Sequence, residues 1–205
     1  MIYTPGNFTV NDRNLLTQLM QENSFATLIV SNGDEPMIAH LPVLFDHATD
    51  TLHAHVARAN PLWRELTPNR EVLFVFQGPH HYVSPACYSV HPSVPTWNYA
   101  VVHAHGTPTI VEEPASVETM LRRLVEEYES ASQTPWRMEL PDDYLQKMIS
   151  AIVAFEVRIT RLEGKFKLSQ NRPRVDQPKV VAALRAAGGD DAARLATLME
   201  QVLKL

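Results

Sequence analysis

The sequence contains a single cysteine, Cys87, among its 205 residues. One thiol cannot form an intrachain disulfide, and the opening MIYTPGNF has neither the basic nor the apolar segment of a secretory signal. A reducing cytoplasm is therefore the expected compartment. Long apolar runs are missing too, because charged or polar residues interrupt each run before it reaches the roughly 18 residues that a membrane helix requires. We expect no role as an integral membrane protein.

The sequence also lacks a surplus of basic residues. Lys and Arg number 18 against 23 Asp and Glu, which gives a formal net charge of −5. This balance disfavours tight binding of nucleic acid by the chain alone. Neither Gly-x-Gly-x-x-Gly nor Gly-x-x-x-x-Gly-Lys occurs, which excludes nucleotide binding of the Rossmann and P-loop types. No Gly-x-Ser-x-Gly elbow accompanies a nucleophile, and we expect the Cys87 thiol to be inert.

The apolar residues that are present predict strands with helices between them. The predicted strands cover residues 25–30, 37–45, 51–56, 72–76, 97–111 and 152–162, and a turn over 31–36 joins the first two. Short connections, interspersed helices and only 7 glycines favour an antiparallel sheet closed into a barrel, which is a mainly β fold of the α+β class.

The predicted helices begin at residues that are suited to a helix start. They follow Asn11, Asn60, Pro114, Pro141 and Pro178, and Asp190 is expected to cap a last helix after the break at Gly188-Gly189. The helix from Pro114 is expected to bury one face, which consists of Val117, Leu121, Leu124, Val125 and Tyr128.

The segment over residues 80–96 is rich in proline. Pro85, Pro92 and Pro95 lie within it and Pro79 just before it. Proline suppresses regular structure, so this segment predicts a rigid surface loop. Loops of this length are usually functional or disordered.

Two His-Ala-His pairs offer a possible metal site. His53 with His55, and His103 with His105, each have the spacing that puts both imidazoles on one face of a strand. Two adjacent strands could thereby assemble four histidine ligands. The alternative is that the polar faces of half-exposed strands carry histidine, and no Asp, Glu or Cys follows a known metal spacing. We expect no metal.

Two segments combine the groups that a flavin mononucleotide (FMN) requires. Its phosphate needs cationic or hydroxyl donors, its ribityl chain needs polar partners, and its flat ring needs apolar or aromatic cover. HAHVARANPLW over residues 53–63 offers Arg58 and Asn60 where a strand gives way to a helical turn. KFKLSQNR over residues 165–172 is rich in basic, hydroxyl and amide groups, although its composition alone favours a solvated charged turn.

Four motifs occur in a fixed order that resembles a known family. They are HVARANPLW, FQGPHHYVSP, VPTWNYAVVHAHG and RLEGKFKLSQNR. Together they resemble the PaiB-like FMN-binding proteins, a family of negative transcriptional regulators, from the N-terminus to about Pro178. The resemblance implies the FMN-binding split β-barrel, in which two chains pair and two cofactor sites form at the dimer interface. It divides the chain into a barrel domain, residues 1–178, and a helical tail, residues 179–205, packed on the body or on the partner chain.

The resemblance also implies which residues hold the cofactor, in three sets. The phosphate and ribityl partners would be His55, Arg58 and Asn60. The residues near the ring and the interface would be Trp97 and Asn98. The polar contacts that close the site would be Lys167, Ser169, Gln170, Asn171 and Arg172.

The sequence departs from the family pattern in two places. The family has Ser-Trp-Tyr at the position where this sequence has Ala86-Cys87-Tyr88. The family then has a longer loop that contains lysine and glycine, and this sequence has SVHPSVPTWNY. The family's Lys-Trp-Lys is Lys165-Phe166-Lys167 here, which keeps an aromatic ring but removes an indole donor.

Three functions remain open from the sequence. The first is an FMN-binding homodimer that regulates transcription indirectly or through a partner, because the chain is acidic and has no helix-turn-helix signature. The second is a flavin-dependent oxidoreductase of unknown substrate. The third is haem binding through one of the histidines.

Overall fold

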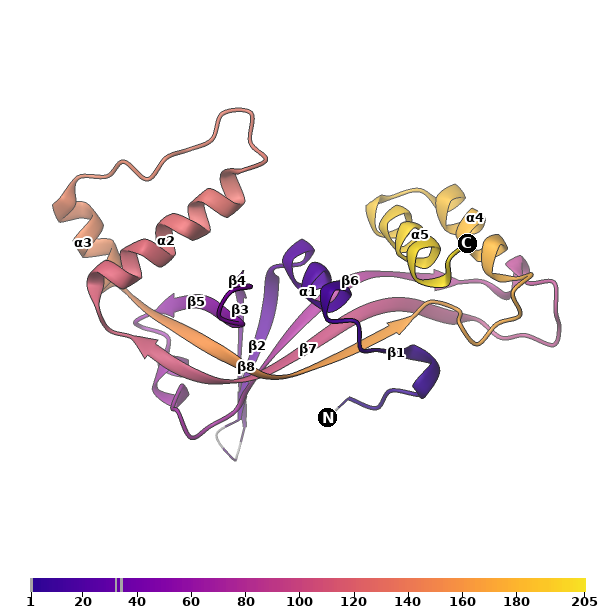
Figure 1. The fold of residues 1–205 in the computed structure, drawn as a ribbon, viewed down its shortest axis with the longest axis horizontal. Coiled ribbons are helices and arrows are strands. Elements are labelled where there is room, and N and C mark those ends of the chain that lie inside the picture. Colours follow the sequence, from indigo (N-terminus) through magenta and orange to yellow (C-terminus); the bar gives the residue numbers. More distant parts are fainter. Residues whose placement is uncertain (1, 32, 34) are drawn as a thin grey trace. The chain divides into compact units, whose positions relative to one another are not determined.

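The computed structural model describes residues 2–31, 33 and 35–205 and contains one eight-stranded sheet (Figure 1). The strand order is β3-β2-β6-β7-β8-β5-β4, with β1 paired to β8. The strands are β1 (Thr9–Val10), β2 (Phe25–Ser31), β3 (Pro36–Pro42), β4 (Leu44–Asp46), β5 (Thr51–Ala57), β6 (Val72–Val83), β7 (Thr96–Val111) and β8 (Ile152–Lys167). Of the predicted turn over 31–36, Asn32 and Asp34 lie outside the described residues. The mainly β prediction is confirmed.

Several strands differ in length from the prediction. The run over 37–45 is divided at Val43 into β3 and β4. The central strand β6 continues to Val83, so the predicted proline-rich loop is wrong over residues 80–83. Strand β8 continues to Lys167 and takes up the first three residues of KFKLSQNR. Phe166, Leu168 and Ser169 are buried, so a solvated charged turn is wrong for this segment.

Five α-helices and three short 3-10 helices complete the described elements. They are α1 (Arg13–Glu22), α2 (Pro114–Glu129), α3 (Asp142–Ser150), α4 (Gln177–Ala187), α5 (Asp190–Leu203), η1 (Gly6–Phe8), η2 (Pro61–Glu65) and η3 (Pro85–Cys87). None of the helices in the described part of the chain is long and apolar enough to cross a bilayer.

Two predicted helix caps are wrong by one residue. The Asp12 carboxylate, and not Asn11, accepts the backbone N–H groups of Asn14 and Leu15 at the start of α1, at 3.0 and 3.3 Å. Gly189 precedes α5 with a φ of +84°, and Asp190 is the first helical residue. A positive φ favours glycine, and the negative charge of Asp190 is still favourable inside the first turn.

The chain forms two compact units, and the first consists of residues 20–76 and 103–162. In this unit, helices α2 and α3 contribute to an apolar cluster with strand residues, whose members are Leu44, Val117, Met120, Leu124, Met138, Leu145, Ile149 and Ala154. The predicted buried face of α2 is correct for Val117 and Leu124, whereas Tyr128 is 48% exposed. The Tyr128 hydroxyl lies 2.8 Å from the Ser24 hydroxyl, which explains why this ring stays at the surface.

The second unit consists of residues 1–19, 77–102 and 163–205. Helices α4 and α5 lie side by side, drawn in yellow in Figure 1. Met199 of α5 is fully buried, with its Sδ atom 3.6 Å from the Asn98 amide nitrogen of β7. This contact places α5 against strand residues of its own unit.

Candidate functional site

Arg58 follows the end of β5 and joins it to the end of α3. Its Nε donates to the Ser150 carbonyl and its Nη2 donates to the Ile152 carbonyl, each at 2.7 Å. Its backbone N–H donates to the Ala151 carbonyl at 2.8 Å. A cation at a helix C-terminus satisfies carbonyls that have no partner within the helix. Nη1 has no hydrogen-bond partner among the described residues, so part of the guanidinium remains available to a ligand.

The remaining residues of HVARANPLW shape the turn after Arg58. The Asn60 side chain accepts the Leu62 N–H at 3.0 Å and caps η2, and Pro61 occupies the first position of that helix. The Trp63 indole donates to the Arg58 carbonyl at 3.0 Å. These contacts fix the direction in which Arg58 leaves the strand.

A pocket of about 450 Å³ lies beside Arg58, within the range of small-molecule sites. Arg58 and the Trp63 ring line it together with the end of β7, the start of α2, the end of α3 and the start of β8. Ala154, which also lines the pocket, is directly opposite His55 in the β5–β8 pair. The structure therefore gathers Arg58, Trp63 and the neighbour of His55 around one space.

His53 and His55 lie on the face of β5 that α2 and α3 cover, since their cross-strand neighbours Leu44 and Ala154 belong to the apolar cluster. His53 Nε2 and His55 Nδ1 are buried and have no hydrogen-bond partner among the described residues. Burial lowers the pKa of both imidazoles.

Three charged groups act on His53 in addition to burial. Arg123 lowers the pKa of His53 further, whereas Glu156 and Asp46 oppose this effect. Glu156 is directly opposite His53 in β8. Asp46 is held by Arg123 at 2.9 Å, which leaves its carboxylate less effective as a partner for a protonated imidazole.

The lowered pKa values of His53 and His55 predict a loss of stability in mild acid. The unfolded imidazoles bind protons near their ordinary value of 6.5, and the folded imidazoles bind them only at lower pH. The unfolded state then holds more protons, so the free energy of unfolding should fall as the pH drops below about 6.5. Urea titrations between pH 7.5 and 5.5 measure this slope.

Two variants test whether His53 and His55, and not the other seven histidines, cause the slope of the unfolding free energy with pH. The double change His53→Gln and His55→Gln should flatten the slope, and His47→Gln, at an exposed histidine, should leave it unchanged. An unchanged slope in the double variant would contradict the assignment.

The two His-Ala-His pairs do not lie on adjacent strands. Strand β8 separates β5, with His53 and His55, from β7, with His103 and His105. His105 Nδ1 is 3.2 Å from Glu71, whose other oxygen accepts the Thr160 hydroxyl at 3.1 Å. The four-histidine metal site considered from the sequence is therefore wrong.

The second group of predicted cofactor residues lies in the other unit and is largely hydrogen-bonded within it. Asn98 is fully buried and its amide donates to the Ser169 hydroxyl at 2.9 Å. Ser169 is buried as well and has a φ of +66°, which is uncommon for a residue with a side chain. Asn98 Oδ1 has no partner in the described part of the chain. These two residues connect β7 to the turn that follows β8.

Lys167 and Gln170 make their contacts close to the same turn. The Lys167 ammonium donates to the Thr96 hydroxyl and, at 3.0 Å, to the Trp97 carbonyl. Burial, and secondarily the charge of Lys165, lowers the pKa of Lys167. The Gln170 side chain bonds backbone groups of residues 166 and 168, and Asn171 is exposed.

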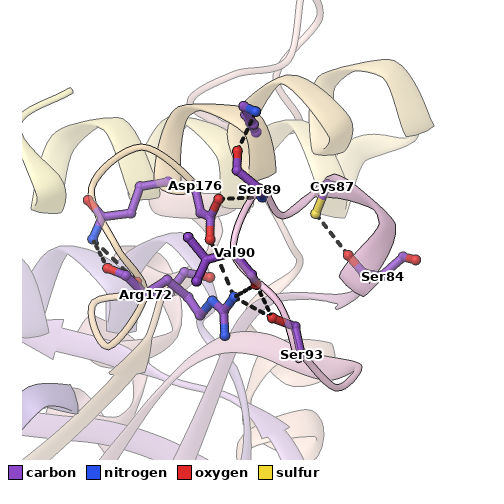
Figure 2. Close-up of polar contacts among 10 residues, drawn as sticks. Ser84, Cys87, Ser89, Val90, Ser93, Arg172 and Asp176 are labelled. Atoms are coloured by element: carbon purple, nitrogen blue, oxygen red, sulfur yellow. Dashed lines mark hydrogen bonds and ion pairs between the residues drawn. The ribbon is translucent and has the colours of Figure 1, made fainter.

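Arg172 holds the loop after η3 against the segment that leads into α4 (Figure 2). Its guanidinium lies 3.9 Å from the Tyr88 ring centroid and donates to the Ser93 hydroxyl at 2.7 Å. It also contacts Asp176, which accepts the Ser89 N–H at 2.6 Å. The Ser89 amide first, and then Arg172, holds the pKa of the Asp176 carboxyl below its usual range. The part of the proline-rich segment that follows β6 is therefore held in place at Ser89, by Asp176, and at Ser93, by Arg172.

Cys87 lies at the end of η3, in the same loop. Its thiol donates to the Ser84 carbonyl at 2.9 Å (Figure 2), and burial raises its pKa. A thiol that stays protonated is a weak nucleophile. The geometry agrees with an inert cysteine.

An aromatic groove of about 350 Å³ is the second candidate space, and we call it the β6–β7 groove. It is lined by Gln77, His80, Trp97, Tyr99, Ala100 and Val101. Trp97 is 53% exposed, and the His80 ring centroid lies 6.1 Å from the Trp97 centroid with the planes inclined by 33°. Large aromatic side chains at a surface commonly serve as contact sites for flat ligands.

The chemistry of these residues fits the parts of a flavin nucleotide. Among the described residues, Nη1 of Arg58 and the buried Nδ1 of His55 have no hydrogen-bond partner, so the first is available to a phosphate. The exposed face of Trp97 suits a flat ring. Arg58, His55 and Trp97 therefore retain groups that a ligand could contact, whereas the side chains of Asn60, Lys167 and Gln170 bond groups of the chain itself.

Comparison with known proteins identifies the family. Residues 2–161 match the family model described as "Putative FMN-binding domain". The chain belongs to this family. It is also 34% identical over 207 residues to "Protease synthase and sporulation protein PAI 2" of Bacillus subtilis, with 99% of both chains covered. The predicted resemblance to the PaiB-like proteins is confirmed, and membership establishes the chain as part of a flavin-binding family.

Solved structures of low sequence identity share the fold. The FAD and haem binding protein of Mycobacterium smegmatis has a TM-score of 0.64 at 16% identity, covering 89% of this chain and 80% of that one. The flavocytochrome Anf3 of Azotobacter vinelandii has a TM-score of 0.62 at 14% identity, covering 78% and 69%. The predicted antiparallel split barrel with peripheral helices is confirmed.

Sequence reasoning did not select several residues that line the two spaces. Trp63, Tyr99 and His80 lie within the motifs that carry the family resemblance, but no role was predicted for them. In the sequence each of these residues is only an aromatic or imidazole side chain near the end of a strand. Such residues are too common to identify a binding site unless the pocket they line is known.

Proposed function

We propose that this flavin-binding family member is a cytoplasmic homodimer that binds FMN and acts on transcription through a partner. The name of the Bacillus subtilis relative connects that protein with protease synthesis and sporulation, and its similarity covers nearly the whole chain. The net charge of −5 favours a partner over direct contact with DNA phosphates. Residues 179–205 remain, in this proposal, a helical tail on the barrel domain of residues 1–178.

The pocket beside Arg58 is the observation that favours FMN. A phosphate dianion would find Nη1 of Arg58 there, which has no partner among the described residues. His55, which is opposite the lining residue Ala154 in the β5–β8 pair, and Asn60, which caps η2 next to Arg58, remain the proposed partners of the phosphate and ribityl chain. Charge-assisted hydrogen bonds from a guanidinium are the strongest contacts a phosphate commonly receives in a protein. For the other unit we propose separately that Trp97 and Asn98 lie near a flavin ring. The polar contacts around that ring would come from Lys167, Ser169, Gln170, Asn171 and Arg172.

The proposed dimer would use the outer face of β2, β3 and β6. Register places Phe25 with Pro42, and Ile29 with Ile38, on the same face. Phe25 is 70% and Ile38 is 56% exposed, whereas Ala26 and Leu28 of the opposite face are buried. Exposed apolar patches on a sheet commonly mark an interaction surface, and a two-fold pair is the commonest way to close one.

The absorption spectrum of the purified protein tests the cofactor proposal. Flavin bands are expected, with FMN released on denaturation and identified by chromatography against FAD and riboflavin standards. A haem Soret band, or FAD as the released flavin, would contradict the FMN assignment, and protein that neither retains nor binds added flavin would contradict it as well.

A further inference from the structure

The edge of the β6–β7 groove carries a histidine whose ring orientation is set by two acceptors. His80 Nδ1 lies 3.4 Å from the Gly78 carbonyl oxygen and 3.5 Å from the Asp191 carboxylate of α5. A carbonyl and a carboxylate accept hydrogen bonds and donate none, so in the neutral imidazole the proton belongs on Nδ1. Nε2 then carries a lone pair.

His80 Nε2 is available to a ligand in the groove. It has no hydrogen-bond partner among the described residues, and the His80 side chain is 42% exposed. The plane of the His80 ring is inclined by 33° to that of the Trp97 ring. It is therefore close to the plane of a flat molecule stacked on the indole. The groove therefore offers an apolar aromatic wall and, at one edge, a hydrogen-bond acceptor in His80 Nε2.

The far wall of the groove adds a second aromatic ring and a cation. Tyr99 lines the groove, and the Lys165 ammonium lies 5.7 Å from the Tyr99 ring centroid. This cation polarises the ring and brings positive charge to the same face of the unit. An electron-poor, planar ring with polar edges suits these walls better than an aliphatic ligand.

We propose that the β6–β7 groove binds a planar heteroaromatic ring through stacking on Trp97, and that His80, positioned by Asp191, accepts a hydrogen bond from an N–H at the edge of that ring. The inference rests on the proposed function in one respect, because the ring that we expect is that of the flavin. Oxidised flavin has one ring N–H, at N3 of its pyrimidine portion. His80 would therefore select for that imide group.

Paired ligands test this contact directly. Riboflavin and N3-methylriboflavin differ only at the proposed donor, and fluorescence titration of the purified protein measures the dissociation constant of each. The parent protein should bind riboflavin about three- to tenfold more tightly, which corresponds to one net hydrogen bond. His80→Ala should reduce this ratio to near one. His80→Gln should retain part of it, because an amide oxygen can still accept.

The neighbouring histidine provides a matched control. His81 lies one residue further along β6, bonds the Tyr82 carbonyl and lines a different pocket, so His81→Ala should leave the ratio unchanged. Asp191→Ala should lower the ratio about twofold, because the Nδ1 proton then has one acceptor fewer.

The outcomes separate this inference from the proposed function. If FMN and riboflavin bind but the ratio persists in His80→Ala, the hydrogen bond is refuted and FMN binding stands. If neither flavin binds the parent protein, both proposals fail. If the ratio persists in Asp191→Ala alone, the positioning role of Asp191 is refuted and the contact from His80 remains.

Discussion

Replacing Arg58 with alanine is expected to weaken FMN binding at least about tenfold while leaving the affinity for riboflavin nearly unchanged. A charge-assisted hydrogen bond to phosphate contributes about 1.5–3 kcal/mol, and a tenfold change corresponds to about 1.4 kcal/mol. Riboflavin has no phosphate, so it does not report this contact. Fluorescence titration of both ligands against the parent protein and the variant measures the difference.

The structure requires a control for this experiment, because Arg58 also bonds the Ser150 and Ile152 carbonyls. Arg64→Ala removes a positive charge from the neighbouring η2, where the Arg64 guanidinium lies over the Trp63 ring. It should leave both affinities unchanged. Equal losses of FMN and riboflavin in Arg58→Ala would show that Arg58 acts by anchoring α3, and the phosphate assignment would fall.

Placing a glutamate at Ile38 is expected to convert the proposed dimer to a monomer. In a two-fold interface the substitution occurs in both copies, so two carboxylates would be buried without partners. The cost of several kcal/mol should weaken dimerisation at least about a hundredfold. Light scattering at micromolar concentration should change from twice the 23.1 kDa of one chain to a single chain.

A second exposed aliphatic residue supplies the control for Ile38→Glu. Val175 is 57% exposed, almost the same as the 56% of Ile38, but it precedes α4 in the other unit. Val175→Glu should leave the mass unchanged. A parent protein that is monomeric, or an Ile38→Glu variant that remains dimeric, would rule out this face as the interface.

Alternation of apolar and polar residues was enough to predict most strands. In Thr51–Ala57, the apolar side chains Leu52, Ala54 and Val56 alternate with His53 and His55, and the structure buries the first set on one face. Alternation is a local property, since successive residues of a strand point to opposite faces whatever they pack against. The family motifs were equally local, and they led to the split barrel.

Element ends were predicted less well because they depend on neighbours that are distant in sequence. Strand β6 continues past Pro79 to Val83, although proline argues against a strand interior. Strand β8 likewise continues to Lys167, and its residues Gly164 and Lys165 pair with Val10 and Thr9 of β1. A short sequence window cannot contain such a partner.

The amino-acid sequence by itself determined the strand pattern, the flavin-binding family and the kinds of residue available to a phosphate and a flat ring. The tertiary structure decided which of those residues can meet a ligand. It placed His55 on the face of β5 that α2 and α3 cover, and it engaged two nitrogens of Arg58 with the Ser150 carbonyl of α3 and the Ile152 carbonyl of β8. It also placed β8 between the histidine pairs and the Asp191 carboxylate of α5 beside His80. The physical reason is that residue type fixes which hydrogen bonds a side chain can make, whereas only the packed chain determines which of them remain unmade.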